Sequence, residues 1–109
     1  MASEPYPLVA TDFYQVLDTS DLPGGVVNIL TGPHAELAPT LAAHMDIDAV
    51  WSFSSTDLAQ LIEGKAAGNL KRTWVNNRAG RDWLGAMGEG RVFLDAATEV
   101  KNIWIPYGE

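Results

Sequence analysis

The chain has 109 residues, which suits one domain with a single core. Hydrophobic residues make up 47% of it and charged residues 19%, an ordinary globular balance that argues against disorder. The net charge of −7 argues against nucleic acid and anionic membranes as partners. The absence of cysteine excludes disulfides, thiolate metal sites and cysteine nucleophiles.

The first half of the chain alternates between helical and extended patterns. A helix is predicted over about 7–18, where apolar residues recur at helical spacing, and it ends before the turn cluster DTSDLPGG. The run VVNIL at 26–30 predicts a strand. A second helix follows at about 34–44, with Pro39 in its first turns because a proline further in would break it.

The same alternation continues in the second half. DAVWSF at 48–53 predicts a strand, and a helix then begins at SSTDL, where Ser54 or Ser55 can cap the free amides. Gly68 suits the left-handed position just past the end of that helix. KRTWV at 71–75 predicts a further strand.

A last amphipathic helix is predicted over about 90–103, with a face that runs from Phe93 to Trp104. Trp83 flanks this helix, and together with Trp104 it could form an exposed association surface. The other two tryptophans fall in adjacent predicted strands and are expected in the core: Trp51 and Trp74.

Strands and helices at this spacing predict βαβ units with right-handed crossovers. The expected fold is a three-layer, Rossmann-like α/β sandwich, an open parallel sheet of at least three strands with flanking helices. The chain opens on a helix, whereas such a sheet normally begins with a strand. Either residues 1–5 form a stub of strand, or the domain completes itself by association through its sheet edges.

Few residues point to catalysis. His34 and His44 lie near opposite ends of one predicted helix and are expected to be structural. GAMGEG at 85–90 follows a loop and is interpreted as a flexible connection. The SFSSTDLA turn could bind a phosphate at a helix N-terminus, or its serines could simply cap that helix. The strand ends, Asn76 and Asn77 included, offer no acid, base or nucleophile.

Several spaced motifs resemble the coenzyme-binding domain of aldehyde dehydrogenases. LPGGVVNILTG is similar to the family's Pro-Pro-Gly-Val-Val-Asn segment, HMDIDAVWSFSST to its His-x-x-Val-Asp strand with Gly-Ser-Thr, and AAGNLKR to the next turn. The resemblance covers about residues 3–72. It implies NAD or NADP as cofactor, with Glu4 near a ribose and Ser55 near the phosphates. Met1 stands where the family has lysine, and Ser54 and Ala59 stand where it has glycines.

The resemblance also implies that this chain is not an enzyme on its own. The family's Glu-Leu-Gly-Gly, whose glutamate is a general base, corresponds to Asn76, Asn77, Arg78 and Ala79. The family's thiol nucleophile has no counterpart, since the chain has no cysteine.

NLKRTWVN and ATEVKNIWIPYGE resemble the C-terminal part of bacterial family-16-type aldehyde dehydrogenases, which carry a degenerate second module. We therefore expect residues 1–109 to be one partial coenzyme-binding domain, with 76–109 as a divergent C-terminal extension. The expected role is structural, through homo-oligomer or parent-protein contacts. Weak NAD(P) binding, or a fragment of a longer NAD-dependent aldehyde oxidoreductase, is the alternative.

No partner among nucleic acids or membranes is expected, since no apolar run approaches the ~18 residues that span a bilayer. The start, MASEPYPL, lacks the basic and hydrophobic regions of a signal peptide. A cytoplasmic setting is therefore the expectation.

Overall fold

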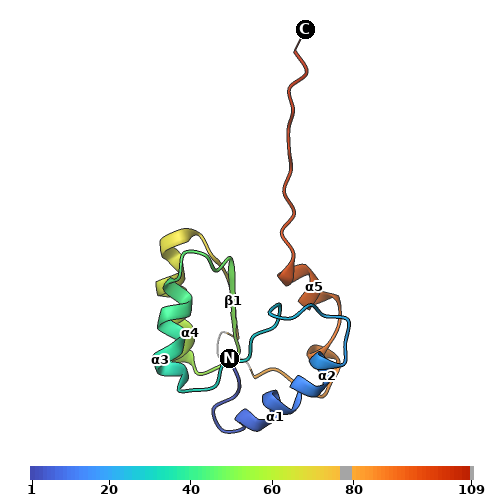
Figure 1. Ribbon diagram of the computed structural model, residues 1–109. Helices are drawn as coiled ribbons and strands as arrows, with labels where there is room; N and C mark the ends of the chain where they lie inside the picture. The colour runs from blue at the N-terminus through green and yellow to red at the C-terminus, as the bar shows by residue number, and fades with distance from the viewer. Residues whose placement is uncertain (77–79, 109) are drawn as a thin grey trace.

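The computed structural model describes residues 1–76 and 80–108. The elements, labelled in Figure 1, are α1 (Pro7–Asp12), α2 (Tyr14–Asp18), α3 (His34–Ala43), β1 (Ala49–Ser52), α4 (Thr56–Ala66), the 3₁₀ turn η1 (Ala67–Asn69), β2 (Arg72–Val75), the 3₁₀ turn η2 (Ala86–Gly88) and α5 (Arg91–Ala97). Within the described residues, no helix has the length and apolar character needed to cross a membrane.

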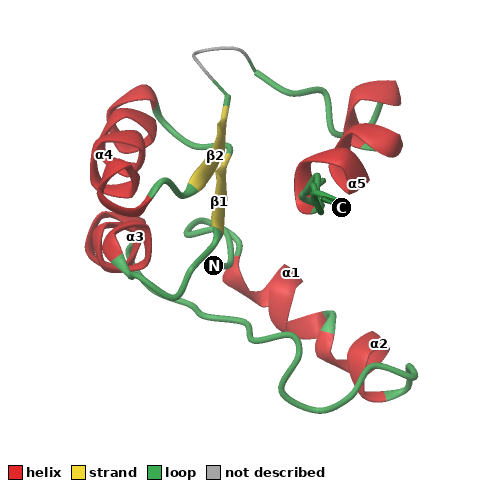
Figure 2. Ribbon diagram, turned by 90° about the horizontal axis from the view of Figure 1, so that it is seen from above, coloured by secondary structure: helices red, strands yellow, loops and turns green. Residues whose placement is uncertain are grey.

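The centre of the fold is a parallel pair of short strands. β1 lies beside β2 with Ala49 opposite Arg72 and Ser52 opposite Val75. Parallel neighbours need a crossover between them, and α4 provides it. Figure 2 shows α3 and α4 on one side of the strands and α5 on the other. The predicted βαβ unit is confirmed, but the described residues form two paired strands instead of three or more.

The helix face of the strand pair is packed with small side chains. Ala38 and Ala42 of α3 meet Ile62 of α4, and all three are buried. Alanines let two helices approach closely, so the single large residue Ile62 fills the space between them, with Val50 of β1 and Leu58 packed against this cluster. The two helices therefore hold one face of β1 in a fixed position.

Two predicted helices are confirmed with small adjustments. The helix expected at 7–18 is present as α1 and α2, divided at Phe13. The helix expected at 34–44 is α3, with Pro39 in its second turn. Proline has no N–H to donate one turn back, and its place early in the helix limits that loss.

The strand predicted at 26–30 is wrong, because these residues form a loop. A strand needs a neighbour to pair with, and here the backbone contact of this kind is one hydrogen bond, 2.8 Å, from the Ala2 N–H to the Leu30 carbonyl. Val26 and Leu30 consequently remain largely exposed. Residues 26–30 therefore have the composition of a strand but no partner strand among the described residues.

The helix predicted over 90–103 is also wrong in its second half. α5 ends at Ala97, and Thr98 has extended backbone angles (φ −104°, ψ 152°). The Thr98 hydroxyl and backbone N–H both donate to the Leu94 carbonyl, and this backbone bond is the last one of the helix. The predicted Phe93–Trp104 helix face therefore does not form, and Trp104 is 90% exposed.

The left-handed residue after α4 is Leu70, not Gly68 as predicted. Gly68 lies inside η1, which prolongs the helical path by one 3₁₀ turn, and Leu70 follows it with φ +57°. A side chain with a Cβ costs about 1–2 kcal/mol in this conformation. The Leu70 side chain is 95% exposed, so no packing offsets that cost.

We predict that Leu70→Gly stabilises the protein by about 0.5–1 kcal/mol, since the relief of strain exceeds the added entropy of the unfolded chain. Ala67→Gly is the matched control, because Ala67 has helical angles (φ −61°) and should lose about as much. Urea unfolding of the two variants measures both changes. A loss of stability in Leu70→Gly would contradict the prediction.

Candidate functional site

One open cleft of about 420 Å³ brings the two predicted cofactor residues together. Glu4 and Ser55 both line it, although about half of the chain separates them in sequence. The cleft lies where α3 and α4 begin, and its other lining residues come from those helices and the turn before α4: His34, Ala35, Ser54, Asp57, Leu58 and Leu61.

Glu4 is engaged by the first residue of α3. Its carboxylate accepts a hydrogen bond from the backbone N–H of His34. The first amides of a helix have no partner within the helix and carry partial positive charge, so this carboxylate stabilises the start of α3. The His34 ring completes the contact, with Nε2 2.6 Å from the Ala2 carbonyl oxygen. Glu4 and His34 thus fasten the N-terminal segment to α3.

Ser55 is the N-cap of α4. It has extended backbone angles (φ −63°, ψ 156°), and its hydroxyl oxygen accepts a hydrogen bond from the Leu58 N–H at 3.4 Å. The neighbouring Ser54 hydroxyl lies 2.7 Å from that of Ser52. Capping therefore accounts for Ser55.

The charges of the cleft lining do not favour a phosphate. Glu4 and Asp57 both line it, and no lysine or arginine is among the described lining residues. Asp57 also lies in the first turn of α4, where it interacts favourably with the helix dipole. An anionic ligand would meet two carboxylates and only the partial positive charge of the helix ends.

The resemblance to aldehyde dehydrogenases places the family's general base at the end of β2. Val75 is buried, and Asn76 is half-buried. Within the described part of the chain, the Asn76 Oδ1 is buried without a hydrogen-bond partner. Asn77, Arg78 and Ala79 lie outside the described residues. An amide at this position cannot accept a proton as a carboxylate would.

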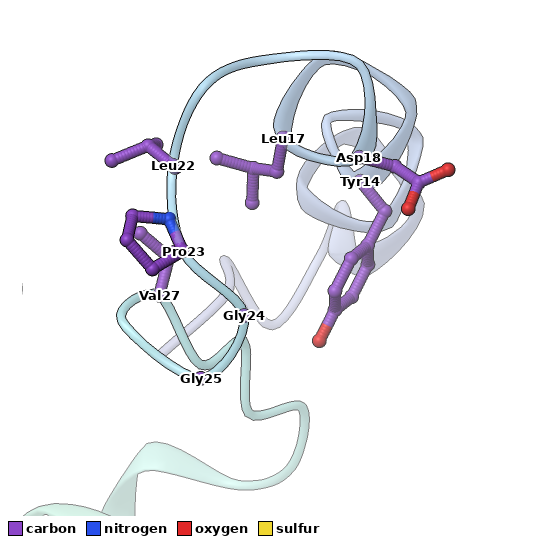
Figure 3. A pocket seen from close by; sticks show the side chains of 8 residues that line it. All are labelled: Tyr14, Leu17, Asp18, Leu22, Pro23, Gly24, Gly25 and Val27. Atoms are coloured by element: carbon purple, nitrogen blue, oxygen red, sulfur yellow. The ribbon is translucent and has the colours of Figure 1, made fainter.

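A second hollow, of about 230 Å³, lies between α2 and the loop that follows it. Figure 3 shows Leu17 pointing towards Leu22, while the Asp18 carboxylate points away from the loop. Its lining also includes Pro23 and Gly24 but none of the predicted site residues. It has an apolar wall and no arrangement of acid, base and nucleophile.

Comparison with known proteins decides the family. A family model described as "Aldehyde dehydrogenase family" matches residues 2–79, well over half of the chain. The chain belongs to the aldehyde dehydrogenase family. No solved structure gives a significant match.

Individual members of the family show the same relationship. An aldehyde dehydrogenase of Alternaria alternata is 31% identical over 107 residues, covering 97% of this chain and 20% of the relative. Aldehyde dehydrogenase, cytosolic 1 of Elephantulus edwardii is 34% identical over 95 residues, which cover 86% of this chain and 18% of the relative. Betaine aldehyde dehydrogenase of Bacillus subtilis is 29% identical over 98 residues, which cover 90% of this chain and 19% of the relative. The chain spans about a fifth of the length of these relatives.

Outside the segment that the aldehyde dehydrogenase family model matches, an arginine joins an aromatic cluster that the sequence analysis missed. The guanidinium of Arg81 lies 4.7–5.5 Å from the centres of four rings. These rings come from the residue after β1, from β2, from the loop before η2 and from α5: Phe53, Trp74, Trp83 and Phe93. Trp51 adds an edge-on contact to Trp74 at 5.1 Å. The aromatic residues that alternate along the strand segments are the feature of the sequence from which this cluster could have been predicted.

The cluster corrects one prediction about the tryptophans. The expectation that Trp51 and Trp74 lie in the core is wrong for Trp51, which is 38% exposed. The two rings pack edge-on at 5.1 Å, and both lie near Phe93 of α5. Trp83 packs edge-on against Phe53 at 4.9 Å and so belongs to this cluster. Trp104 lies in the extended segment after α5. The two residues expected to share one association surface therefore belong to different parts of the molecule.

The glycines of GAMGEG have a packing role beyond that of a flexible connection. The Asp82 carboxylate accepts hydrogen bonds from the N–H groups of Leu84 and Gly85. Arg81 Nε donates to the Met87 carbonyl at 2.6 Å, which orients the guanidinium. A Cβ on Gly88 would lie 2.2 Å from the Trp83 carbonyl oxygen, so this turn requires glycine there.

We predict that Gly88→Ala destabilises the protein by about 1–3 kcal/mol, because backbone must move away from the new methyl group and carry Trp83 out of the cluster. Gly68→Ala is the matched control, since a Cβ added there would have no other atom within 4 Å, and it should change stability little. Urea unfolding followed by tryptophan fluorescence measures both. Equal stabilities would show that the turn tolerates the methyl group.

Proposed function

We propose that this chain is a non-catalytic aldehyde-dehydrogenase-like module whose role is structural, in assembly with a second copy or with the rest of a parent protein. The observation that carries the proposal is a group of exposed apolar side chains with no partner among the described residues. It includes the segment after α5, in which five apolar side chains are each at least 68% exposed: Val100, Ile103, Trp104, Ile105 and Tyr107. Contiguous apolar surface on a monomer is typical of an interaction site.

The chemistry of the chain supports the non-catalytic part of the proposal. There is no cysteine to act as nucleophile, and an asparagine occupies the position that corresponds to the family's general base. Without these groups, aldehyde oxidation would need residues from elsewhere. If a longer enzyme contains this segment, NAD-dependent oxidation would be an activity of that enzyme.

The proposal also specifies the type of aldehyde dehydrogenase from which the chain derives. We take the chain as the C-terminal part of a degenerate second module of the bacterial family-16 type, acting in the cytoplasm. Its coenzyme-like domain would be a three-layer, Rossmann-like sheet of which β1 and β2 are two strands. The helices on one side of these strands and α5 on the other support that arrangement.

We predict a dimer or larger species in size-exclusion chromatography with light scattering, with a mass that falls on dilution. Trp104→Ser should weaken this association, because a 90% exposed side chain contributes little to the fold but much to a contact. Leu84→Ser is the matched control, since Leu84 is fully exposed outside the segment after α5. A compact monomer at high concentration would contradict the assembly role.

Weak NAD(P) binding is the second candidate, favoured by the one cleft that Glu4 and Ser55 share. The two carboxylates in the lining lower the expected affinity for the phosphates of a dinucleotide. We predict that Ser55→Asp abolishes any binding heat with NAD or NADP, because a negative charge is placed beside the phosphates.

Calorimetric titration tests this without disturbing the fold, since aspartate is as good an N-cap as serine. Gln60→Glu, on an exposed position of α4 away from the cleft lining, adds the same charge and should leave binding unchanged. Binding that survives Ser55→Asp would place the ligand elsewhere.

A further inference from the structure

We infer that the aromatic cluster around Arg81 is a binding site for small organic cations of the alkylguanidinium class, and that Arg81 is its internal occupant. The inference is independent of the proposed assembly role, because the site is built within one chain. Three observations support it: the closed arrangement of four rings, the choice of rings instead of a carboxylate as partners of the guanidinium, and the exposure of one ring to solvent.

The four rings that contact the guanidinium form a closed circuit, which we call the cage. The ring of Phe53 packs against Trp74 with centres 5.2 Å apart, and Trp74 packs against Phe93 at 5.4 Å. Trp83 closes the circuit, 6.3 Å from Phe93 and 4.9 Å from Phe53. Four separate segments of the chain supply these rings, so the tertiary fold builds the cage and no local motif does.

The cage holds a cation at similar distances from all its walls. The guanidinium carbon of Arg81 lies 4.7 Å from the ring centre of Phe93 and 5.5 Å from those of Phe53 and Trp83. These distances are within the reach of about 6 Å at which a ring face attracts a cation. A guanidinium is planar and weakly hydrated, so it stacks on aromatic faces more readily than an ammonium. The cage therefore suits a flat organic cation.

The partners of Arg81 are unusual for a cation in an acidic chain. Acidic residues outnumber basic ones by 14 to 7, yet the ion pairs of the described residues belong to Arg91 and Lys101. The carboxylate of Asp82, the next residue, accepts two backbone N–H groups of its own turn instead. The rings and the Met87 carbonyl are thus the partners that the described structure gives this guanidinium.

The cage borders solvent on one side. Trp83 is 51% exposed, whereas Trp74 and Phe93 are half-buried. Arg81 is itself half-buried, and one side-chain hydrogen bond, from Nε to the Met87 carbonyl, orients it. A long side chain with few anchors can withdraw while the strands stay in place. A free cation of the same shape then has a route to the rings.

The cage is separate from the cleft that Glu4 and Ser55 share, since none of its four rings lines that cleft. Arg81, Trp83 and Phe93 also lie outside residues 2–79, which the family model matches. Because Arg81 is tethered, its effective concentration at the cage is high, and a free cation binds the unmodified chain only weakly. Removal of this side chain should open the site.

The test titrates the full-length Arg81→Ala variant with ethylguanidinium, which replaces the atoms that the substitution removes. Tryptophan fluorescence and calorimetry should show saturable binding, at least about tenfold tighter than to the unmodified chain. Ethylurea has nearly the same flat shape without the charge and should bind much more weakly. A folded Arg81→Ala variant that does not bind ethylguanidinium, or binds ethylurea equally well, overturns the inference.

A second substitution locates the binding. Trp83→Leu, added to Arg81→Ala, keeps an apolar side chain but removes one ring face, and should weaken ethylguanidinium binding about tenfold. Trp104→Leu, added in the same way, is the matched control, because Trp104 is 90% exposed in the segment after α5. Binding that Trp83→Leu leaves unchanged would place the cation outside the cage and overturn the inference.

The test also decides the case in which Arg81→Ala fails to fold. Ethylguanidinium should then restore its near-ultraviolet circular dichroism, and failure to do so overturns the inference. Arg81→Met separates charge from packing, since it fills the space with an apolar side chain. If Arg81→Met matches the unmodified chain in urea unfolding while ethylguanidinium gives Arg81→Ala no stability, the cluster is an apolar core and the inference is wrong. None of these measurements depends on oligomer mass, which tests the assembly role.

Discussion

The parallel pairing of β1 and β2 is the constraint on which the rest of the structure depends. Because parallel neighbours need a crossover, the pair requires α4, and the turn into α4 sets the position of Ser55. α3 packs against α4 through alanines, so the start of α3 and the start of α4 meet at one cleft. The two predicted cofactor residues come together as a consequence of this one pairing.

The two faces of that strand pair are stabilised by different interactions. On one face, small side chains allow close helix packing around Ile62. On the other, the guanidinium of Arg81 contacts the rings of Trp74 of β2 and Phe93 of α5, which draws the loop and α5 onto the strands. A cation above several ring faces is held electrostatically as well as by contact. The second face therefore depends on the turn that Gly88 makes possible.

The cleft brings Glu4 and Ser55 together, with no lysine or arginine among its described lining residues. Glu4 is already bound to the amide of His34, and Asp57 adds a second negative charge. Many large apolar side chains, by contrast, are exposed and have no packing partner among the described residues. These two features are the grounds on which we propose association as the role of the segment.

Local sequence determined the helices, the cap and the family. The N-cap at Ser55, the βαβ unit and the motifs of the aldehyde dehydrogenase family depend on neighbouring residues, which can be read directly along the chain. Tertiary structure alone decided the fate of 26–30, the end of α5 and the role of Arg81. A strand exists only with a partner, and an amphipathic helix persists only if its apolar face is covered. The spacing of residues along the chain predicts neither the partner strand nor the cover of the helix face, because both come from segments distant in sequence.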